Sequence, residues 1–445
     1  MKKNKYFGTD GIRGIVGQDF DAELAIRIAH ATATYIKRRP AKVVIGWDTR
    51  ASCDFIVHIF AGILSYYGID VVKVGVVPTA ALSFLTNKLK ADLGVMVSAS
   101  HCSAKYNGVK FFTPRGEKLS DDENYEFDKL IVKNTRAEGE YVGTITENLK
   151  AIKIWQRYLV RKFKPLLDLK LKIAVDGAFG SGAKCAREVF ETLGIHADFL
   201  NDKSTGFNIN DGCGATKPSY MSAVMSNGDF DLGFAFDGDA DRCIVFDEKG
   251  NHIHGDIIIF LLAKYFKDQG KLAKNKTVAT ILFNLGVEKA LNAQGIKLVR
   301  TNVGDAPVYH ALKKEGLTLG GETCGHIIFP HIWRGGDGLV LALMVLAVLN
   351  GKGKFSELSN EVSVYPQINI NTEANPAQKR KLFTDKDFNT FVKSSQSKYK
   401  DFRIIVRPSG TESIVRVTVE GAEKNKCEQI AIEIVAKIRK VLKSI

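Results

Sequence analysis

The sequence lacks the usual marks of a secreted, membrane-bound or nucleotide-binding protein. Its seven cysteines form no C-x-x-C pair and their number is odd, which disfavours a disulfide framework or a structural zinc site. The basic first residues have no apolar core for a signal peptide, and the longest apolar run, residues 339–349, is too short to span a bilayer. No Walker sequence occurs, and no G-x-G-x-x-G follows a strand pattern. We therefore expect a soluble, cytoplasmic protein with reduced thiols.

The composition is that of a globular protein with several domains. At 445 residues the chain is too long for one ordinary hydrophobic core. The net charge of +14 could attract nucleic acid, attract small anionic substrates, or reflect only a lysine-rich surface. No dense basic block appears in the sequence, so we expect neither a nucleic-acid partner nor a membrane partner.

Strand and helix patterns alternate along most of the chain, which predicts an α/β protein with mixed sheets. One helix is expected over residues 22–36, and a second follows residue 50 and ends at about residue 67. Buried strands are expected over 43–46, 71–74, 93–97, 171–176 and 277–282. The polar segments 133–149 and 355–371 are plausible seams. From residue 402 two strands and an amphipathic helix, 423–442, indicate a small α+β domain. The predicted domains are 1–150, 151–252, 253–362 and 363–445.

Asp237, Asp239 and Asp241 alternate along a loop between two apolar runs. Three carboxylates at this spacing repel one another, and a hard divalent cation such as Mg²⁺ or Ca²⁺ would relieve the repulsion. An EF-hand loop is the rival interpretation, because Glu248 stands at the twelfth position. Arg242, however, occupies the position where that loop needs glycine, and the flanks 232–236 and 243–247 read as strands rather than helices. An acidic turn without metal also remains possible.

Two further loops carry groups that suit catalysis or sugar binding. The segment 97–101, ending in Ser100 and His101, follows a buried strand, where the ligands of open α/β sheets bind. A serine hydroxyl there is a candidate nucleophile, with His101 and Lys110 as proton handlers or charge stabilisers. The glycine-rich loop 320–326 brings Glu322 and His326 together, and Glu322 could accept hydrogen bonds from a hydroxylated ligand. Ordinary turns explain both loops as well.

A loop near the C-terminus has the side chains that a phosphate monoester requires. Arg407 and Arg416 can form bidentate bonds, Ser409 and Thr411 carry hydroxyl donors, and Gly410 allows backbone N–H groups to point inward. Together with a hydroxyl nucleophile, a cation site and a hydroxyl-binding loop, this predicts phosphoryl transfer.

Taken in order, these loops resemble the signature loops of the α-D-phosphohexomutases, and the likeness covers essentially the whole chain. The opening Tyr-Phe-Gly-Thr-Asp-Gly-Ile-Arg-Gly, residues 6–14, is similar to that of bacterial phosphoglucosamine mutases. Further matching segments are 46–50, 76–79, 208–210 with 213–214, and 336–339.

The resemblance implies four domains around a central cleft and a set of functional residues. It implies that Ser100 carries phosphate and that Asp237, Asp239 and Asp241 bind Mg²⁺ together with an oxygen of that phosphoserine. The sugar would contact Glu322, Thr323, Cys324 and His326, and its other phosphate would contact Arg407, Ser409, Gly410, Thr411 and Arg416. Near the transferred phosphoryl group the likeness places Arg13, His101, Lys110, Arg242 and His326.

The implied reaction interconverts glucosamine 6-phosphate and glucosamine 1-phosphate and feeds UDP-N-acetylglucosamine synthesis. Ser100 donates its phosphate, a sugar 1,6-bisphosphate turns over in the cleft, and the other phosphate returns to Ser100. The only implied partner is the phosphosugar, and the protein is expected to be a monomer or homodimer.

The chain departs from the family pattern at three places. Cys102 and Ser103 stand where Asn-Pro is usual, Thr323 and Cys324 where glucosamine-type members have Gln-Ser, and Ala306 and Pro307 where Arg-Tyr is common. These departures leave open a sibling phosphomannomutase or phosphoglucomutase, a non-catalytic phosphosugar-binding relative, and an enzyme sensitive to oxidation at Cys102 and Cys324.

Overall fold

The computed structural model describes residues 4–8, 10–38, 40–138, 141–167, 170–409 and 413–443. The chain forms two compact units. The first contains Met1–Leu282 and Lys297–Ser359, and the second contains Phe283–Ile296 and Asn360–Ile445.

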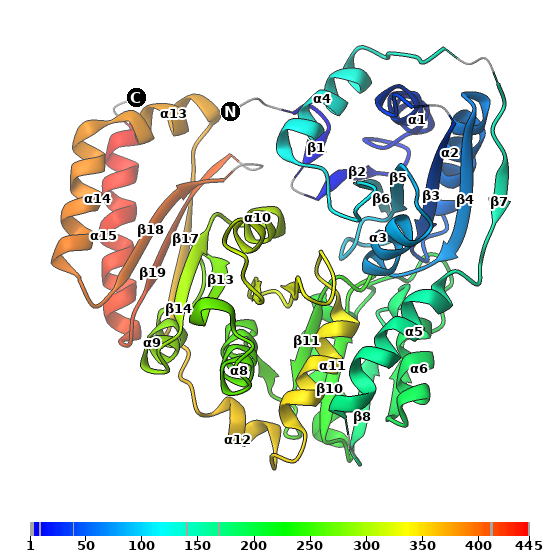
Figure 1. The fold of residues 1–445 in the computed structure, drawn as a ribbon. Coiled ribbons are helices and arrows are strands. Elements are labelled where there is room, and N and C mark those ends of the chain that lie inside the picture. The colour runs from blue at the N-terminus through cyan, green and yellow to red at the C-terminus, as the bar shows by residue number, and fades with distance from the viewer. Residues whose placement is uncertain are drawn as a thin grey trace. The chain divides into compact units, whose positions relative to one another are not determined.

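The first unit begins with a seven-stranded mixed sheet in the order β1-β2-β6-β5-β3-β4-β7 (Figure 1). Its strands are β1 (Phe7–Gly8), β2 (Gly11–Ile15), β3 (Ala41–Trp47), β4 (Ile69–Val76), β5 (Leu93–Val97), β6 (Tyr106–Phe112) and β7 (Ile145–Glu147). Its helices are α1 (Ala22–Tyr35), α2 (Cys53–Tyr66), α3 (Thr79–Lys88) and α4 (Asp121–Val132). The apolar strand β5 is buried throughout because helices cover the sheet. A capping box of Ser120 and Glu123 begins α4.

The second sheet is smaller and has the order β12-β11-β10-β8-β9. Its strands are β8 (Lys172–Asp176), β9 (His196–Leu200), β10 (Leu232–Phe236), β11 (Cys243–Phe246) and β12 (His252–Ile253). The accompanying helices are α5 (Ile152–Phe163), α6 (Gly182–Leu193) and α7 (Pro218–Asn227), with short 3₁₀ turns at Lys164–Leu166 and Gly214–Thr216.

The third sheet completes the first unit and has the order β14-β13-β15-β16. Its strands are β13 (Lys276–Thr280), β14 (Lys297–Thr301), β15 (Gly320–Gly321) and β16 (Ile327–Ile328). The helices are α8 (Gly255–Asp268), α10 (Asp305–Glu315), α11 (Gly338–Leu349) and α12 (Phe355–Ser359), with a 3₁₀ turn at Ala273–Asn275.

The second unit is built on a three-stranded antiparallel sheet in the order β17-β19-β18. Its strands are β17 (Gln367–Glu373), β18 (Arg403–Pro408) and β19 (Ile414–Glu420), and its helices are α9 (Leu285–Ala293), α13 (Pro376–Thr384), α14 (Lys386–Lys398) and α15 (Lys424–Lys443). Helices α14 and α15 lie side by side against the sheet (Figure 1). Its core is separate and includes Leu382, Val417 and Ile434.

The three sheets of the first unit share one design that positions the loops of interest. In each, parallel strands are followed by an antiparallel neighbour: β5 pairs with β6, β10 with β11 and β15 with β16. The Ser100 loop, the Asp237 loop and the Glu322 loop each connect one of these antiparallel pairs. Each loop therefore begins at the carboxyl end of a parallel strand, the edge where α/β sheets bind ligands.

The predicted fold class is confirmed, with three mixed α/β sheets and a C-terminal α+β part. The segment 133–149 is more than a seam, because it supplies β7, which pairs in parallel with β4. The segment 355–371 likewise contains α12 and the start of β17. Within the described residues, no helix combines the length and hydrophobicity needed to cross a bilayer. The three boundaries between the four predicted domains stay predictions.

Candidate functional site

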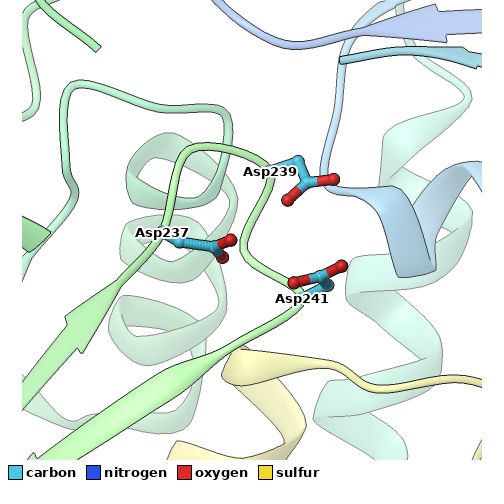
Figure 2. Close-up of side chains that lie close together, drawn as sticks. All are labelled: Asp237, Asp239 and Asp241. Atoms are coloured by element: carbon cyan, nitrogen blue, oxygen red, sulfur yellow. The ribbon is translucent and has the colours of Figure 1, made fainter. Parts of the chain in front are cut away.

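The loop between β10 and β11 brings three carboxylates together. Asp237, Asp239 and Asp241 are all buried, and one oxygen of each lies within 4.8 Å of the others. Figure 2 shows the three side chains converging from one turn. The flanking elements are antiparallel strands, so the EF-hand alternative, which requires helices, is excluded.

Burial and mutual repulsion strongly affect the ionisation of the triad. Burial, followed by the charges of Asp241 and Asp239, raises the pKa of Asp237 to about 8. Burial also opposes the ionisation of Asp241, but Lys110, His326 and Arg242 outweigh it and lower the pKa of Asp241. The triad therefore combines one carboxyl that is difficult to ionise, Asp237, with one whose negative charge is stabilised by neighbouring cations, Asp241.

The donor set of the triad fits a hard divalent cation. Oδ1 of Asp239 and Oδ1 of Asp241 are buried and make no hydrogen bond with any residue the structure describes. Buried oxygens of this kind are costly unless a partner satisfies them. All three candidate ligands are carboxylates, which favour Mg²⁺ or Ca²⁺ over soft metals.

Ser100 lies directly against the triad. Its Oγ donates a hydrogen bond of 2.6 Å to Oδ2 of Asp237, a residue 137 positions away in the sequence. Ser100 is buried and has a positive φ of 50°, a conformation that non-glycine residues adopt at a cost of about 1–3 kcal/mol and that clusters at functional sites.

Lys110 is a buried cation at the centre of the site. Its Nζ lies 2.7 Å from Asp239, 3.0 Å from Asp10 and 3.2 Å from Asp241. Burial works against its charge, but Asp10, Asp239 and Asp241 outweigh burial and raise the pKa of Lys110 well above its usual range. Lys110 is therefore protonated at neutral pH.

His101 has the opposite character. Burial and the positive charges of Arg242 and Arg13 lower its pKa to about 4, so its imidazole is neutral at pH 7. Nδ1 of His101 lies 3.4 Å from Oγ of Ser100. Arg13 pairs with Asp10, and the backbone amide of Arg242 donates to Asp237 at 3.2 Å. The structure thus brings the expected phosphoryl-site residues into one cluster.

The glycine-rich loop between β15 and β16 reaches the same cluster. Nδ1 of His326 lies 3.8 Å from Asp241, and a cavity of about 300 Å³ reaches both residues. Oε1 of Glu322 accepts a hydrogen bond of 3.0 Å from the amide of Gly304. The hydroxyl of Thr323 donates to Asp256 in α8 at 2.8 Å.

Cys324 is a partly buried thiol beside a cation. Burial raises its pKa to about 11, although the nearby Arg242 acts to lower it. The thiol is therefore protonated at neutral pH, which lowers its reactivity toward oxidants.

The predicted phosphate loop belongs to the second compact unit. Arg407 and Arg416 stand directly opposite each other on β18 and β19. Burial and the charge of Arg416 lower the pKa of Arg407, so two guanidinium groups repel each other across the sheet. Nζ of Lys379 donates to the carbonyl of Ser409 at 2.8 Å. Gly410 and Thr411 lie outside the described residues.

Four consecutive segments of the chain match the four domains of one family. Residues 4–138, 140–250 and 254–365 match the alpha/beta/alpha domains I, II and III of phosphoglucomutase/phosphomannomutase, and residues 368–437 match its C-terminal domain. The chain belongs to the phosphoglucomutase/phosphomannomutase family. This confirms the family that the loops predict.

Curated relatives within this family are similar over nearly their whole length. The chain is 40% identical over 437 residues to a phosphoglucosamine mutase of Clostridium acetobutylicum, covering 96% of this chain and 97% of that protein. It is 38% identical over 448 residues to one of Bacillus velezensis, covering 98% of each.

Solved structures of family members have the same fold. A phosphoglucomutase/phosphomannomutase family protein from Burkholderia thailandensis matches with a TM-score of 0.85 and 25% identity, over 100% of this chain and 98% of that one. The N-acetylphosphoglucosamine mutase of Aspergillus fumigatus, solved with GlcNAc-6P and magnesium, matches with a TM-score of 0.67 and 20% identity, over 99% and 96% of the chains. At 20% identity the second match concerns the fold alone.

Several residues that contact the triad or Lys110, directly or through another residue, were not predicted from the sequence. Asp10 binds Lys110 and Lys118, and Lys118 also pairs with Asp305. The hydroxyl of Thr79 donates to Oδ2 of Asp239 at 2.6 Å. Asp10 and Thr79 belong to segments that matched the family pattern, and that was the available signal. Lys118 and Asp305 meet across 187 positions, so no local pattern could pair them.

Proposed function

We propose that the protein is a phosphoglucosamine mutase that interconverts glucosamine 6-phosphate and glucosamine 1-phosphate through a phosphorylated Ser100 and a glucosamine 1,6-bisphosphate. The observation that carries the proposal is the 2.6 Å contact between Oγ of Ser100 and the acidic triad. It unites a hydroxyl nucleophile with a cation site, which is the arrangement that phosphoryl transfer needs. The choice of amino sugar is supported by the curated relatives at 38–40% identity.

Asp237, Asp239 and Asp241 would hold the metal ion, for which we propose Mg²⁺. Their donors are all carboxylate oxygens, and the Aspergillus fumigatus relative was solved with magnesium. When bound, the cation would neutralise charge on the transferred phosphoryl group.

The chain's own residues account for the transfer. A sugar hydroxyl attacks the phosphorus on Ser100, the bond from phosphorus to Oγ breaks, and a new P–O bond to the sugar forms. The hydroxyl proton passes to the neutral imidazole of His101 and from there to Oγ of Ser100, which lies 3.4 Å from Nδ1. Lys110 remains charged and stabilises the negative charge of the transition state.

The remaining predicted residues serve binding in this proposal. Glu322, Cys324 and His326 would contact the sugar, while Thr323 is turned toward Asp256 and would shape the loop. Arg407, Ser409, Gly410, Thr411 and Arg416 would bind the phosphate that does not react. After the first transfer the bisphosphate turns over, and its other phosphate returns to Ser100.

The test is a mutase assay with Mg²⁺ and a catalytic amount of sugar 1,6-bisphosphate, run on glucosamine, glucose and mannose phosphates. We expect preference for glucosamine phosphates and a loss of roughly a thousandfold or more in kcat for Ser100→Ala, because the nucleophile is removed. Ser103→Ala is the matched control, because its side chain is exposed on the same loop. Preference for glucose or mannose would reassign the sugar. Full turnover by Ser100→Ala would overturn the mechanism.

A further inference from the structure

Both backbone polar groups of Ser100 are held by buried side chains. Its amide donates to Oγ of Ser98 at 2.8 Å, and Ser98 in turn donates to Asp48 at 2.7 Å. Its carbonyl accepts from Arg50 at 3.0 Å and from Asn210 at 2.8 Å. A positive φ at a non-glycine residue persists only where the surroundings over-determine it, and here these contacts do so.

Arg50 uses every N–H group of its guanidinium. The five donors go to the carboxylate of Asp48 and to the carbonyl oxygens of Ser100, Cys102, Ser103 and Tyr106. An arginine side chain has five N–H donors, so none remains for a ligand. Its side chain is also 0% exposed. The guanidinium of Arg50 therefore has no donor left for the substrate, and its hydrogen bonds go to this loop and to Asp48.

The carbonyl of Ser100 also lies against the loop between β10 and β11, which carries the acidic triad. A Cβ placed on Gly238 would stand 2.7 Å from that oxygen, so the two loops pack closer than any other residue type at position 238 would allow. The side-chain amide of Asn210 donates hydrogen bonds to the carbonyls of Ser100 and Cys102, at 2.8 and 3.0 Å. A shift of the Ser100 carbonyl would therefore disturb the approach of Oγ to Asp237.

We propose that Arg50 is a positioning residue for phosphoryl transfer, which holds Ser100 in its left-handed conformation with Oγ against Asp237. This inference rests on the proposed function. Arg50 acts by fixing the four carbonyl groups that define the path of the loop.

The same contacts explain how the loop accommodates Cys102 and Ser103. Arg50 binds carbonyl oxygens, which every residue type supplies, so the hold does not depend on the side chains at these two positions. A loop held in this way needs neither the fixed φ of a proline nor the amide of an asparagine.

The test is Arg50→Lys, because lysine keeps the charge opposite Asp48 but offers three donors where arginine offers five. Ser100 phosphorylation by glucose 1,6-bisphosphate and Mg²⁺ is followed by intact mass. We expect its rate and kcat to fall about ten- to a hundredfold, with KM unchanged within about twofold, since misplacement affects the transition state and not binding. Backbone hydrogen exchange over residues 98–106 should rise. Arg187→Lys is the matched control, because Arg187 pairs with Asp202 away from the loop.

A folded Arg50→Lys protein that is phosphorylated at the wild-type rate would overturn the inference, as would a change confined to KM. If Arg50→Lys does not fold, Asn210→Ala decides, because Asn210 is the other donor to two of the same carbonyls; an unchanged rate there also overturns it. Failure of the wild-type protein to be phosphorylated would instead contradict the proposed function. In that case, backbone hydrogen exchange over residues 98–106, compared between the wild-type protein and Arg50→Lys, still tests whether Arg50 orders the loop.

Discussion

Among single residues, Asp237 bears most of the repulsion within the acidic triad. Lys110 lies within 3.2 Å of Asp239 and Asp241, whereas the carboxylate of Asp237 receives hydrogen bonds, among the described residues, from Ser100 and the amide of Arg242. Burial, followed by the charges of Asp241 and Asp239, makes ionisation of Asp237 unfavourable in the protein without metal and raises its pKa to about 8. A bound cation would remove this penalty.

The raised pKa of Asp237 predicts how metal-free stability depends on pH. The folded state binds the proton more tightly than the unfolded state, whose pKa is near 3.8, so the free energy of unfolding should fall as the pH rises from about 4 to about 8. Asp237→Asn should weaken this dependence and raise the Tm at pH 8 in EDTA. Thermal unfolding at several pH values measures both effects.

Asp239→Asn is the matched control for that experiment. Asp239 accepts hydrogen bonds from Lys110 and Thr79, so its replacement weakens a favourable pair and should lower the Tm at pH 8. An Asp237→Asn protein that is destabilised to the same extent would show that Asp237 carries no ionisation penalty.

Among the elements, helix α11 lies in the hydrophobic core and contacts, at its first residue, the loop that carries the acidic triad. All twelve of its residues are buried, and it packs on α8 and β11. The amide of Gly338 at its start donates to the carbonyl of Ala240 at 2.9 Å, and a Cβ on Gly338 would meet the carbonyl of Arg242 at 2.4 Å. The first turn of α11 is thus part of the support for the triad.

The N-terminal cap of α11, Asp337, leads to a prediction about stability. Oδ1 of Asp337 accepts from the amides of Leu339 and Val340 at 2.7 and 3.0 Å, so Asp337→Ala should lower the free energy of unfolding by about 1–2 kcal/mol. Asp337→Asn keeps the caps and removes a carboxyl whose pKa burial raises to about 7. It should therefore be at least as stable as wild type at pH 8. Urea unfolding compares them, and equal losses in both variants would contradict the cap.

The whole molecule consists of two compact units with separate cores. The triad and Ser100 lie in the first unit, and the core around Leu382, Val417 and Ile434 lies in the second. Helix α9 belongs to the second unit although it lies between β13 and β14 in the sequence, because Asn284 bonds to Tyr365 and Leu285 to Glu420.

This division predicts two thermal transitions. If the triad binds Mg²⁺ as proposed, the ion should stabilise only the unit that contains the triad, by about 2.7 kcal/mol at a hundred times the Kd. Calorimetry should therefore show one transition that moves upward with Mg²⁺ and one that does not. Ile434→Ala, in the second core, should lower only the other transition. A single transition that moves as a whole would contradict independent units.

Local patterns in the sequence identified most of the elements and the reacting groups. Continuous apolar runs predicted β5 and β10, and the alternation of Asp237, Asp239 and Asp241 predicted a cation site. These features depend on neighbours within a few positions, which is the range over which strand and helix periods and turn chemistry operate.

The order of the amino acids was enough to predict the fold class, the family and the types of residue in the site. Three features became known from the folded structure: Lys118 pairs with both Asp10 and Asp305, α9 belongs to the C-terminal unit, and Arg50 donates hydrogen bonds to the loop of Ser100. Each of these depends on a polar group finding partners far along the chain. Burial makes such pairing obligatory without specifying the partner, so the partner is known only once the sheets have brought the loops together.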